Sequence, residues 1–216
     1  MIKRPFYQVM LVTNKNNAPI DEYLQFIQRC AESGVTSVQC REKHLSDTEL
    51  LSFGKALQEV LAPFNIPLLI NDRLDIAIAI NAAGVHLGQT DGDPSSARER
   101  LGPDKIIGVS IDSIANLHRS NLLPLDYVGI GSIFPTQNKS NVSTFWGTDG
   151  LNELTALSQH PVVAIGGIDE RNAIEVINAG AAGIAAIGAF HDASDPAHVS
   201  NHFSQLIHHH SSKRFL

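Results

Sequence analysis

Strand-like and helix-like segments alternate along the whole of this chain with a short period. Short apolar runs, several of them β-branched, predict strands, and the amphipathic stretches between them predict helices. The predicted strands cover residues 7–13, 37–41, 67–71, 84–87, 106–110, 127–130, 162–165 and 183–187. The predicted helices cover residues 21–33, 46–61, 73–80, 94–101, 114–120, 151–158, 170–179 and 196–208. Eight such units predict an α/β protein with a single (β/α)8 TIM barrel, and a doubly wound open sheet is the alternative.

Composition limits the size of the fold and the kind of partner. A chain of 216 residues that is 43% hydrophobic can bury one substantial core, so we expect residues 1–216 to form one domain, with a frayed tail over residues 208–216. The formal net charge of −6 excludes the broad basic face of a nucleic-acid-binding protein, and any phosphate binding must be local. Cys30 and Cys40 lack the spacing of a zinc site or a disulfide framework and are expected to be reduced apolar fillers.

The amino-terminal sequence bears on where the protein resides. Lys3, Arg4 and Pro5 precede an apolar run that superficially looks like a signal peptide. That run is short, is broken by Gln8 and lacks a small-residue cleavage site, so it predicts a first strand. No other apolar run is long enough to span a bilayer, and we expect a cytoplasmic protein with no membrane partner.

Polar residues gather where the second predicted strand ends, in the run Gln39-Cys40-Arg41-Glu42-Lys43. The carboxyl ends of barrel strands surround one mouth, where the active sites of such enzymes lie. Gln39, Arg41 and Lys43 alternate, so an extended backbone turns all three toward one side. Arg41 and Lys43 there suit an anion such as pyrophosphate, and the Gln39 amide suits a heterocycle. Surface ion pairs of Arg41 and Glu42 are the alternative.

Two acidic residues follow the third and fourth predicted strands. Asp72 stands in Asn71-Asp72-Arg73, and Asp91 opens Asp91-Gly92-Asp93-Pro94. Carboxylates from neighbouring loops, together with phosphate oxygens and waters, are the usual ligands of Mg²⁺. Each residue alone has a structural alternative, Asp72 as a helix N-cap and Asp91 as a turn residue. Near Arg41 and Lys43, the pair predicts a metal–pyrophosphate site.

The later strands are followed by glycines and by one long loop. Gly166-Gly167 follows the seventh predicted strand and Gly188 the eighth, where barrels often bind phosphate on backbone amides, although glycine also serves tight turns. The loop over residues 134–149 is rich in Thr, Asn and Ser and is a candidate lid.

The helix-capping residues and the histidines are expected to have structural rather than functional roles. Ser46 and Glu49 form a predicted capping box, and Asp169 is a predicted N-cap. His86 is expected to be a satisfied, partly buried histidine. The run His208-His209-His210 is expected to be a solvated helix end, and we assign it no role.

Together these segments resemble the thiamine-phosphate synthase family, in order and over nearly the whole chain. The resemblance rests on Gln39-Cys40-Arg41-Glu42-Lys43, Ile70-Asn71-Asp72, His86-Leu87-Gly88-Gln89-Thr90-Asp91, Gly108-Val109-Ser110, Phe134-Pro135-Thr136-Gln137-Asn138-Lys139 and Ala164-Ile165-Gly166-Gly167-Ile168. It implies a transferase that joins an aminopyrimidine methyl diphosphate to a hydroxyethylthiazole phosphate. The products would be thiamine phosphate and pyrophosphate.

The same resemblance implies a role for each matching residue. The pyrimidine diphosphate would bind Gln39, Cys40, Arg41, Glu42, Lys43, Asn71, Ser110 and Lys139, with Arg41, Lys43 and Lys139 as the catalytic cations. Asp72 and Asp91 would hold Mg²⁺. The thiazole phosphate would bind Thr136, Gln137, Asn138, Gly167, Ile187 and Gly188.

This chain departs from the family pattern at three positions. The family usually has Thr where this chain has Asn138, often His where it has Asp112, and commonly Ser where it has Gly188. Asn138 keeps hydrogen-bonding ability, whereas Gly188 offers only its backbone amide.

Two alternative functions remain from the sequence. A thiazole tautomerase on the same barrel would carry a catalytic histidine where this chain has Ser132, and a non-catalytic barrel would only bind a phosphorylated metabolite. The metal pair and Lys139 favour the synthase. Whether the chain forms a homo-oligomer is left open.

Overall fold

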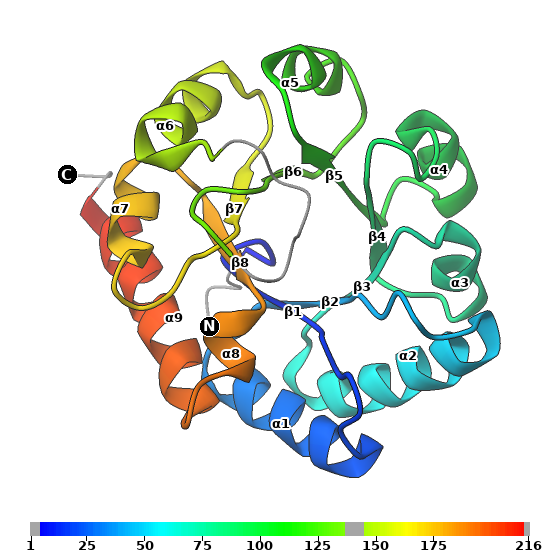
Figure 1. Cartoon of the computed structure of the whole chain (residues 1–216). Helices are drawn as coiled ribbons and strands as arrows, with labels where there is room; N and C mark the ends of the chain where they lie inside the picture. Colours follow the sequence, from blue (N-terminus) through cyan, green and yellow to red (C-terminus); the bar gives the residue numbers. More distant parts are fainter. Residues whose placement is uncertain (1–4, 137–144, 214–216) are drawn as a thin grey trace.

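Eight parallel strands close into a barrel in the order of the sequence (Figure 1). The computed structural model describes residues 5–136 and 145–213. The strands are β1 (Val9–Val12), β2 (Ser37–Cys40), β3 (Leu68–Asn71), β4 (Gly84–Leu87), β5 (Ile106–Ile111), β6 (Tyr127–Ile130), β7 (Val162–Ile165) and β8 (Gly183–Ala186). Because β1 pairs with both β2 and β8, the sheet has no edge. The predicted TIM barrel is confirmed, and the open sheet was the wrong alternative.

The helices form a ring outside the barrel, as the view along its axis shows (Figure 1). They are α1 (Ile20–Ser33), α2 (Asp47–Leu61), α3 (Leu74–Ala79), α4 (Pro94–Leu101), α5 (Ile114–Ser120), α6 (Gly147–Leu157), α7 (Ala173–Asn178), α8 (Gly188–His191) and α9 (Pro196–Lys213), with a 3-10 turn η1 (Ala62–Phe64) after α2. No helix among the residues described is long and apolar enough to cross a membrane.

Side-chain alternation along the strands divides the core into two layers. Outward-facing residues such as Val38 and Ile70 pack against the helices, and the free thiol of Cys30 is buried in the same layer. Inside the barrel a smaller cluster, which includes Met10 and Tyr127, fills the interior. The ring of Phe6 packs edge-on against Tyr127, with ring centroids 5.7 Å apart. The interior is therefore solid below the mouth, as small barrels require.

The helix boundaries test the local predictions. The capping box is confirmed, since the Ser46 hydroxyl accepts the Glu49 N–H and the Glu49 carboxylate accepts the Ser46 N–H. The N-cap prediction at Asp169 is wrong, because α7 begins only at Ala173 and the Asp169 carboxylate accepts the N–H of Arg171 in a preceding turn. Helix α9 continues to Lys213, beyond its predicted end at residue 208. Helix α8 was not predicted, because four residues are too few to show a helical period.

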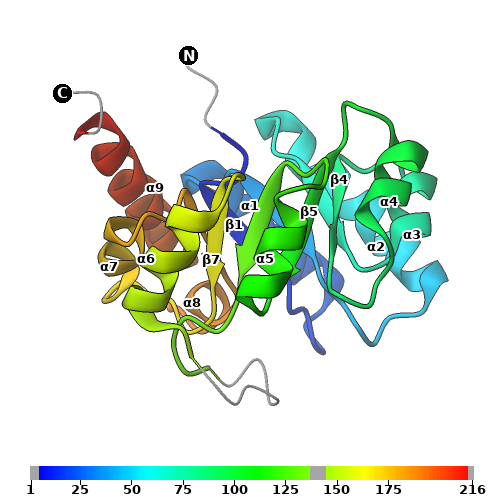
Figure 2. The ribbon, with the colours of Figure 1, turned by 90° about the horizontal axis from the view of Figure 1, so that it is seen from above.

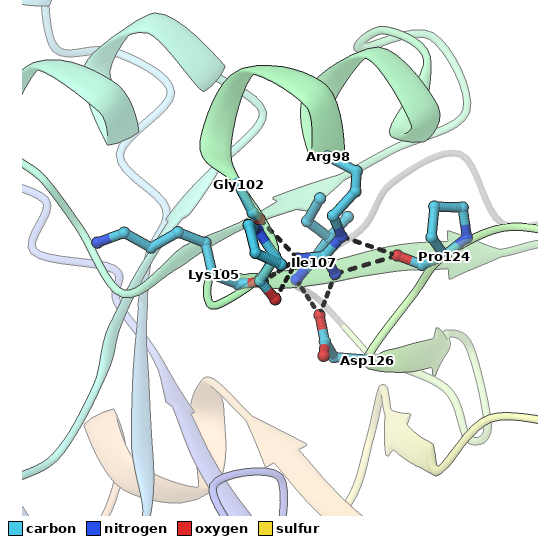
Figure 3. A network of polar contacts seen from close by, with 7 residues as sticks. Arg98, Gly102, Lys105, Ile107, Pro124 and Asp126 are labelled. Atoms are coloured by element: carbon cyan, nitrogen blue, oxygen red, sulfur yellow. Dashed lines mark hydrogen bonds and ion pairs between the residues drawn. The ribbon is translucent and has the colours of Figure 1, made fainter.

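Arg98 ties together the amino-terminal ends of β5 and β6, as Figure 3 shows. Its guanidinium donates to the carbonyl oxygens of Gly102, Lys105 and Pro124 and to the Asp126 carboxylate, 2.6 Å away. The same carboxylate accepts the N–H of Ile107 at 2.8 Å. Residues at this face of a TIM barrel serve stability, so the Arg98 network belongs to the scaffold.

Candidate active site

A cavity of about 940 Å³ opens at the carboxyl ends of the strands. Most of the predicted site residues line it: Gln39, Arg41, Lys43, Asn71, Asp72, Asp91, Ser110, Thr136, Gly167, Ile187 and Gly188. They come from seven different strands or the loops that follow them, which is how a TIM barrel builds its site. The predicted residues Gln137, Asn138 and Lys139 lie outside the described part of the chain.

The run at the end of β2 contributes alternate residues only. Gln39, Arg41 and Lys43 line the cavity. Cys40 is turned to the outer layer of the core with 1% of its surface exposed, and burial raises the pKa of its thiol to about 12. Glu42 points to the loop after β1, where its carboxylate accepts the N–H of Lys15 at 2.9 Å. Neither Cys40 nor Glu42 lines the cavity, because successive strand residues face opposite sides, and their predicted role in substrate binding stays a prediction.

Asp72 and Asp91 form an acidic pair on one side of the cavity. The backbone N–H of Asp72 donates to the His86 carbonyl at 2.8 Å, and the Asp91 carboxylate accepts the N–H of Gly88 at 2.8 Å. Burial, followed by the hydrogen bond and charge of Asp91, raises the pKa of Asp72 to about 6. The positive charges of Lys43, whose Nζ is 3.7 Å from Asp72, and of Arg41 oppose this rise. The two carboxylates are thus close enough to repel each other when both are ionised.

This pair fits a hard divalent cation that has few protein ligands. Among residues 5–136 and 145–213, no three histidine, cysteine or acidic side chains converge as a metal site. A structural zinc site would require four such ligands, whereas Mg²⁺ commonly binds one or two carboxylates and completes its shell with substrate phosphate and water. Asp72 and Asp91 therefore suit Mg²⁺ that arrives with a diphosphate.

A buried polar network forms the floor of the cavity. His86 lies between the Tyr127 hydroxyl, 2.7 Å from its Nδ1, and the Ser110 hydroxyl, 2.9 Å from its Nε2. Burial lowers the pKa of His86 to about 4, so the ring is neutral and one nitrogen donates while the other accepts. The prediction of a satisfied histidine is confirmed. Sequence reasoning missed Tyr127, although its aromatic ring at an inward position of β6 was a usable signal.

The loop after β7 requires its two glycines. Gly166 and Gly167 both have positive φ, and a Cβ on Gly167 would lie 2.5 Å from the Pro135 carbonyl oxygen. The Asn172 side chain donates to the Gly167 carbonyl at 2.9 Å and fixes the turn. This packing places Gly167 against the loop that carries Thr136. The backbone of Gly166 and Gly167 is therefore bare at this end of the cavity, next to the loop after β6, and such backbone suits a phosphate group.

Asp112, where the chain departs from the family pattern, and Ser132, where a tautomerase would carry its histidine, also lie in the cavity wall. The Asp112 carboxylate accepts a hydrogen bond from the Asn116 amide, so it is held by helix α5, which follows it in the chain. Ser132 is 8% exposed and has a φ of 60°. A serine at this position offers no imidazole for proton transfer at the place where the tautomerase would carry its histidine.

Comparison with known sequences and structures fits this geometry. The sequence model of the thiamine monophosphate synthase family matches residues 9–190. The chain belongs to the thiamine monophosphate synthase family. This confirms the resemblance inferred from the motifs, and the matched range includes every predicted site residue.

Individual relatives of the family agree along nearly their whole length. A thiamine-phosphate synthase of Chlamydia abortus is 50% identical over 202 residues, which cover 94% of this chain and 95% of the relative. One of Vibrio campbellii is 38% identical and covers 93% of this chain and 98% of the relative. The solved structure of a thiamine phosphate pyrophosphorylase from Pyrococcus furiosus aligns with a TM-score of 0.84 and 30% identity, covering 95% of this chain and 97% of that one.

Proposed function

We propose that this chain joins 4-amino-2-methyl-5-(diphosphooxymethyl)pyrimidine to 4-methyl-5-(2-phosphooxyethyl)thiazole, giving thiamine phosphate and pyrophosphate. The observation that carries the proposal is one cavity with cations and an acidic pair at one end and bare glycine backbone at the other. The first end suits a diphosphate with its metal, and the second suits a single phosphate. The reactants are small phosphorylated molecules, in keeping with the family of transferases to which the chain belongs.

Bond breaking comes first in the proposed reaction. The bond between the pyrimidine methylene carbon and the diphosphate oxygen breaks, and its electron pair leaves with pyrophosphate. Arg41 and Lys43 stabilise the negative charge that develops on this leaving group. Asp72 and Asp91 would hold Mg²⁺, which when bound adds positive charge beside the departing oxygens.

The floor of the cavity holds the pyrimidine while it is cationic. The electron-rich aminopyrimidine ring delocalises the positive charge on its methylene carbon. Gln39 presents an amide to the ring, and Ser110, whose hydroxyl is held by His86, presents a second polar group. The thiazole nitrogen then donates its lone pair to the methylene carbon and closes the new carbon–nitrogen bond. No group has to remove a proton in this sequence, which agrees with a neutral, buried His86.

Turnover with both substrates tests the proposal directly. Purified protein, the two substrates and Mg²⁺ should give thiamine phosphate and pyrophosphate in equal amounts, with no release of inorganic phosphate. Thiamine phosphate formed without pyrophosphate would contradict the proposed chemistry. Isomerisation of a thiazole phosphate in the absence of the pyrimidine would instead support a tautomerase, and tight binding of either substrate without turnover would support a non-catalytic barrel. A cytoplasmic location stays a prediction from the sequence, and the oligomeric state stays open.

A further inference from the structure

Tyr23 and His191 form a hydrogen-bonded pair outside the cavity, between α1 and α8. The two helices lie side by side in Figure 1, and the Tyr23 hydroxyl is 2.7 Å from Nε2 of His191. Tyr23 is 4% exposed, and His191 is partly buried. Neither residue lines the cavity, and the proposed reaction assigns a role to neither.

The partners of the pair define which atom donates in each bond. Nδ1 of His191 lies 2.8 Å from the Ile187 carbonyl oxygen, which can only accept, so this nitrogen carries the proton. Nε2 is then the acceptor, because burial lowers the pKa of His191 and keeps the ring neutral. The Tyr23 hydroxyl therefore donates to Nε2, and it accepts the N–H of Asn14 at 3.0 Å. Nδ1 of His191 donates, its Nε2 accepts, and the Tyr23 hydroxyl both donates and accepts, so each polar atom of the pair has a partner.

The His191 ring of the pair hydrogen-bonds to the peptide unit between Ile187 and Gly188, which lies in the cavity wall. The carbonyl of Ile187 and the N–H of Gly188 belong to one planar, trans peptide unit and point in opposite directions. The His191 ring holds the Ile187 carbonyl on the side of α8. The backbone N–H groups of Phe190 and His191 also donate to this carbonyl, at 3.1 Å each. The direction of the Gly188 N–H is fixed with it. Ile187 and Gly188 both line the cavity at the proposed phosphate end.

The orientation of this peptide is important because residue 188 is a glycine. Glycine has no side-chain donor, so the backbone N–H is the only group that it offers to a phosphate. Glycine also leaves the backbone conformationally free, so a further constraint, beyond the α8 backbone N–H groups that bond to the Ile187 carbonyl, helps to select one orientation. Tyr23 and His191 supply such a constraint, and through Asn14 they connect it to the loop after β1.

We propose that Tyr23 and His191 are positioning residues for the thiazole phosphate, acting through the orientation of the peptide between Ile187 and Gly188. This inference rests on the proposed function. It predicts that loss of the Tyr23 hydroxyl weakens the binding of one substrate and not of the other, because the diphosphate end of the cavity is built on different strands.

The test compares Tyr23→Phe, His191→Phe and the double variant by steady-state kinetics with each substrate varied in turn. Each single variant should raise KM for the thiazole phosphate roughly 10-fold, the size of one net hydrogen bond, and leave KM for the pyrimidine diphosphate within about 2-fold. The double variant should be no worse than the poorer single variant, because residues that act as a unit are not additive.

Phe26→Leu is the matched control. The Phe26 ring packs on His191 with centroids 4.9 Å apart, but the contact involves no hydrogen bond. This variant should lower thermal stability and leave both KM values near wild type. The inference is overturned by an unchanged thiazole KM in Tyr23→Phe, or by a parallel rise of both KM values that follows the loss of thermal stability.

Failure of this inference can be told apart from failure of the proposed function. Absence of turnover in the wild-type protein contradicts the function. Calorimetric titration of wild type and Tyr23→Phe with the thiazole phosphate alone then tests the inference without catalysis, and equal dissociation constants overturn it. Should Tyr23→Phe fail to fold, His191→Leu at the more exposed partner takes its place, with the same expected split of KM values, because leucine can make neither hydrogen bond.

Discussion

Asp72 combines two unfavourable features at one position in the wall of the cavity. Its backbone has a φ of 64°, in the left-handed region, and its carboxyl group faces that of Asp91. A non-glycine residue in this conformation costs of order 1 kcal/mol and is found most often at functional sites. The bond from Asp72 to the His86 carbonyl is made by the backbone N–H and does not use the carboxylate, which lies 3.7 Å from Nζ of Lys43. These features are explained if the carboxylate is there for a cation.

The first prediction is that Asp72→Asn loses activity and keeps the fold. Asparagine tolerates the left-handed conformation well and preserves the shape of the side chain, but it removes the charge. We expect kcat to fall about 10²-fold or more, as when one preorganised electrostatic contact is lost, with thermal stability unchanged or slightly higher. Exhaustive chelation should likewise abolish wild-type turnover, and added Mg²⁺ should restore it. Full activity after chelation would contradict the proposed role of Mg²⁺ in the reaction.

The second prediction concerns His86 and pH. The folded protein holds the pKa of this residue near 4, whereas in the unfolded chain it is about 6.5. Between these values the unfolded state binds the proton and the folded state does not, so stability falls as the pH falls from 6.5 toward 4.

His86→Gln isolates this contribution, because glutamine keeps hydrogen bonding without titrating. Denaturant unfolding of wild type and variant is measured at about pH 8 and about pH 4.5. The stability advantage of the wild type should shrink by roughly 2–3 kcal/mol at the lower pH, since one pKa unit corresponds to about 1.4 kcal/mol. A difference that is constant between the two pH values would show that His86 is not buried as a neutral ring.

At the scale of the element, strand β2 shows what the sequence could predict and what it could not. The two-residue period correctly placed Gln39, Arg41 and Lys43 on one side. The family motif, taken as a continuous run, also included Cys40 and Glu42, which do not line the cavity, because a motif does not record which way each side chain faces. The strands were predicted well because apolar runs report burial in a parallel sheet.

Contacts between elements far apart in the chain could not be predicted from the sequence. Tyr127 meets His86 across 41 positions, and Tyr23 meets His191 across 168. Such pairs depend on how the barrel closes, and a single sequence has no periodic signal for them. The same is true of α8, whose few residues could equally have been a loop.

The third prediction concerns Lys139 in the loop between β6 and α6, which lies outside the described residues. If this lysine neutralises the leaving diphosphate, as the family resemblance implies, Lys139→Ala should lower kcat by about 10²-fold. Lys139→Arg should restore only part of it, because a planar guanidinium does not reproduce a compact ammonium group. Thermal stability is the control and should not change. A near-normal kcat in the alanine variant would exclude Lys139 from the mechanism.

At the scale of the whole molecule, the barrel separates chemistry from scaffold. The cavity occupies the carboxyl ends of the strands. Helix α8, which begins at the cavity residue Gly188, lies in the lower part of the molecule in Figure 2. The Arg98 network lies at the opposite ends, directly before β5 and β6. Since the two faces share no side-chain contact in the interactions described, a change at one should not alter the function of the other.

The fourth prediction tests this separation with Arg98→Ala. The change leaves the Asp126 carboxylate and several carbonyl groups without their donor, so we expect a loss of about 3 kcal/mol of stability. KM and kcat measured well below the melting temperature should stay within about 2-fold of wild type. Arg100→Ala is the control on the same helix, because its ion pair with Asp75 is exposed and should contribute at most about 1 kcal/mol. A large change in KM in Arg98→Ala would contradict the separation of the two faces.

The burial of both cysteines has a practical consequence for spectroscopy. Cys30 and Cys40 are the only cysteines of the chain, and burial raises the pKa of each thiol to about 12, so neither is a ready target for a maleimide or a methanethiosulfonate. A single thiol introduced at a solvent-facing position, such as Leu122→Cys at a site that is 85% exposed, would be the one that reacts. Fluorophores or spin labels could then be attached at chosen positions without first removing the native cysteines.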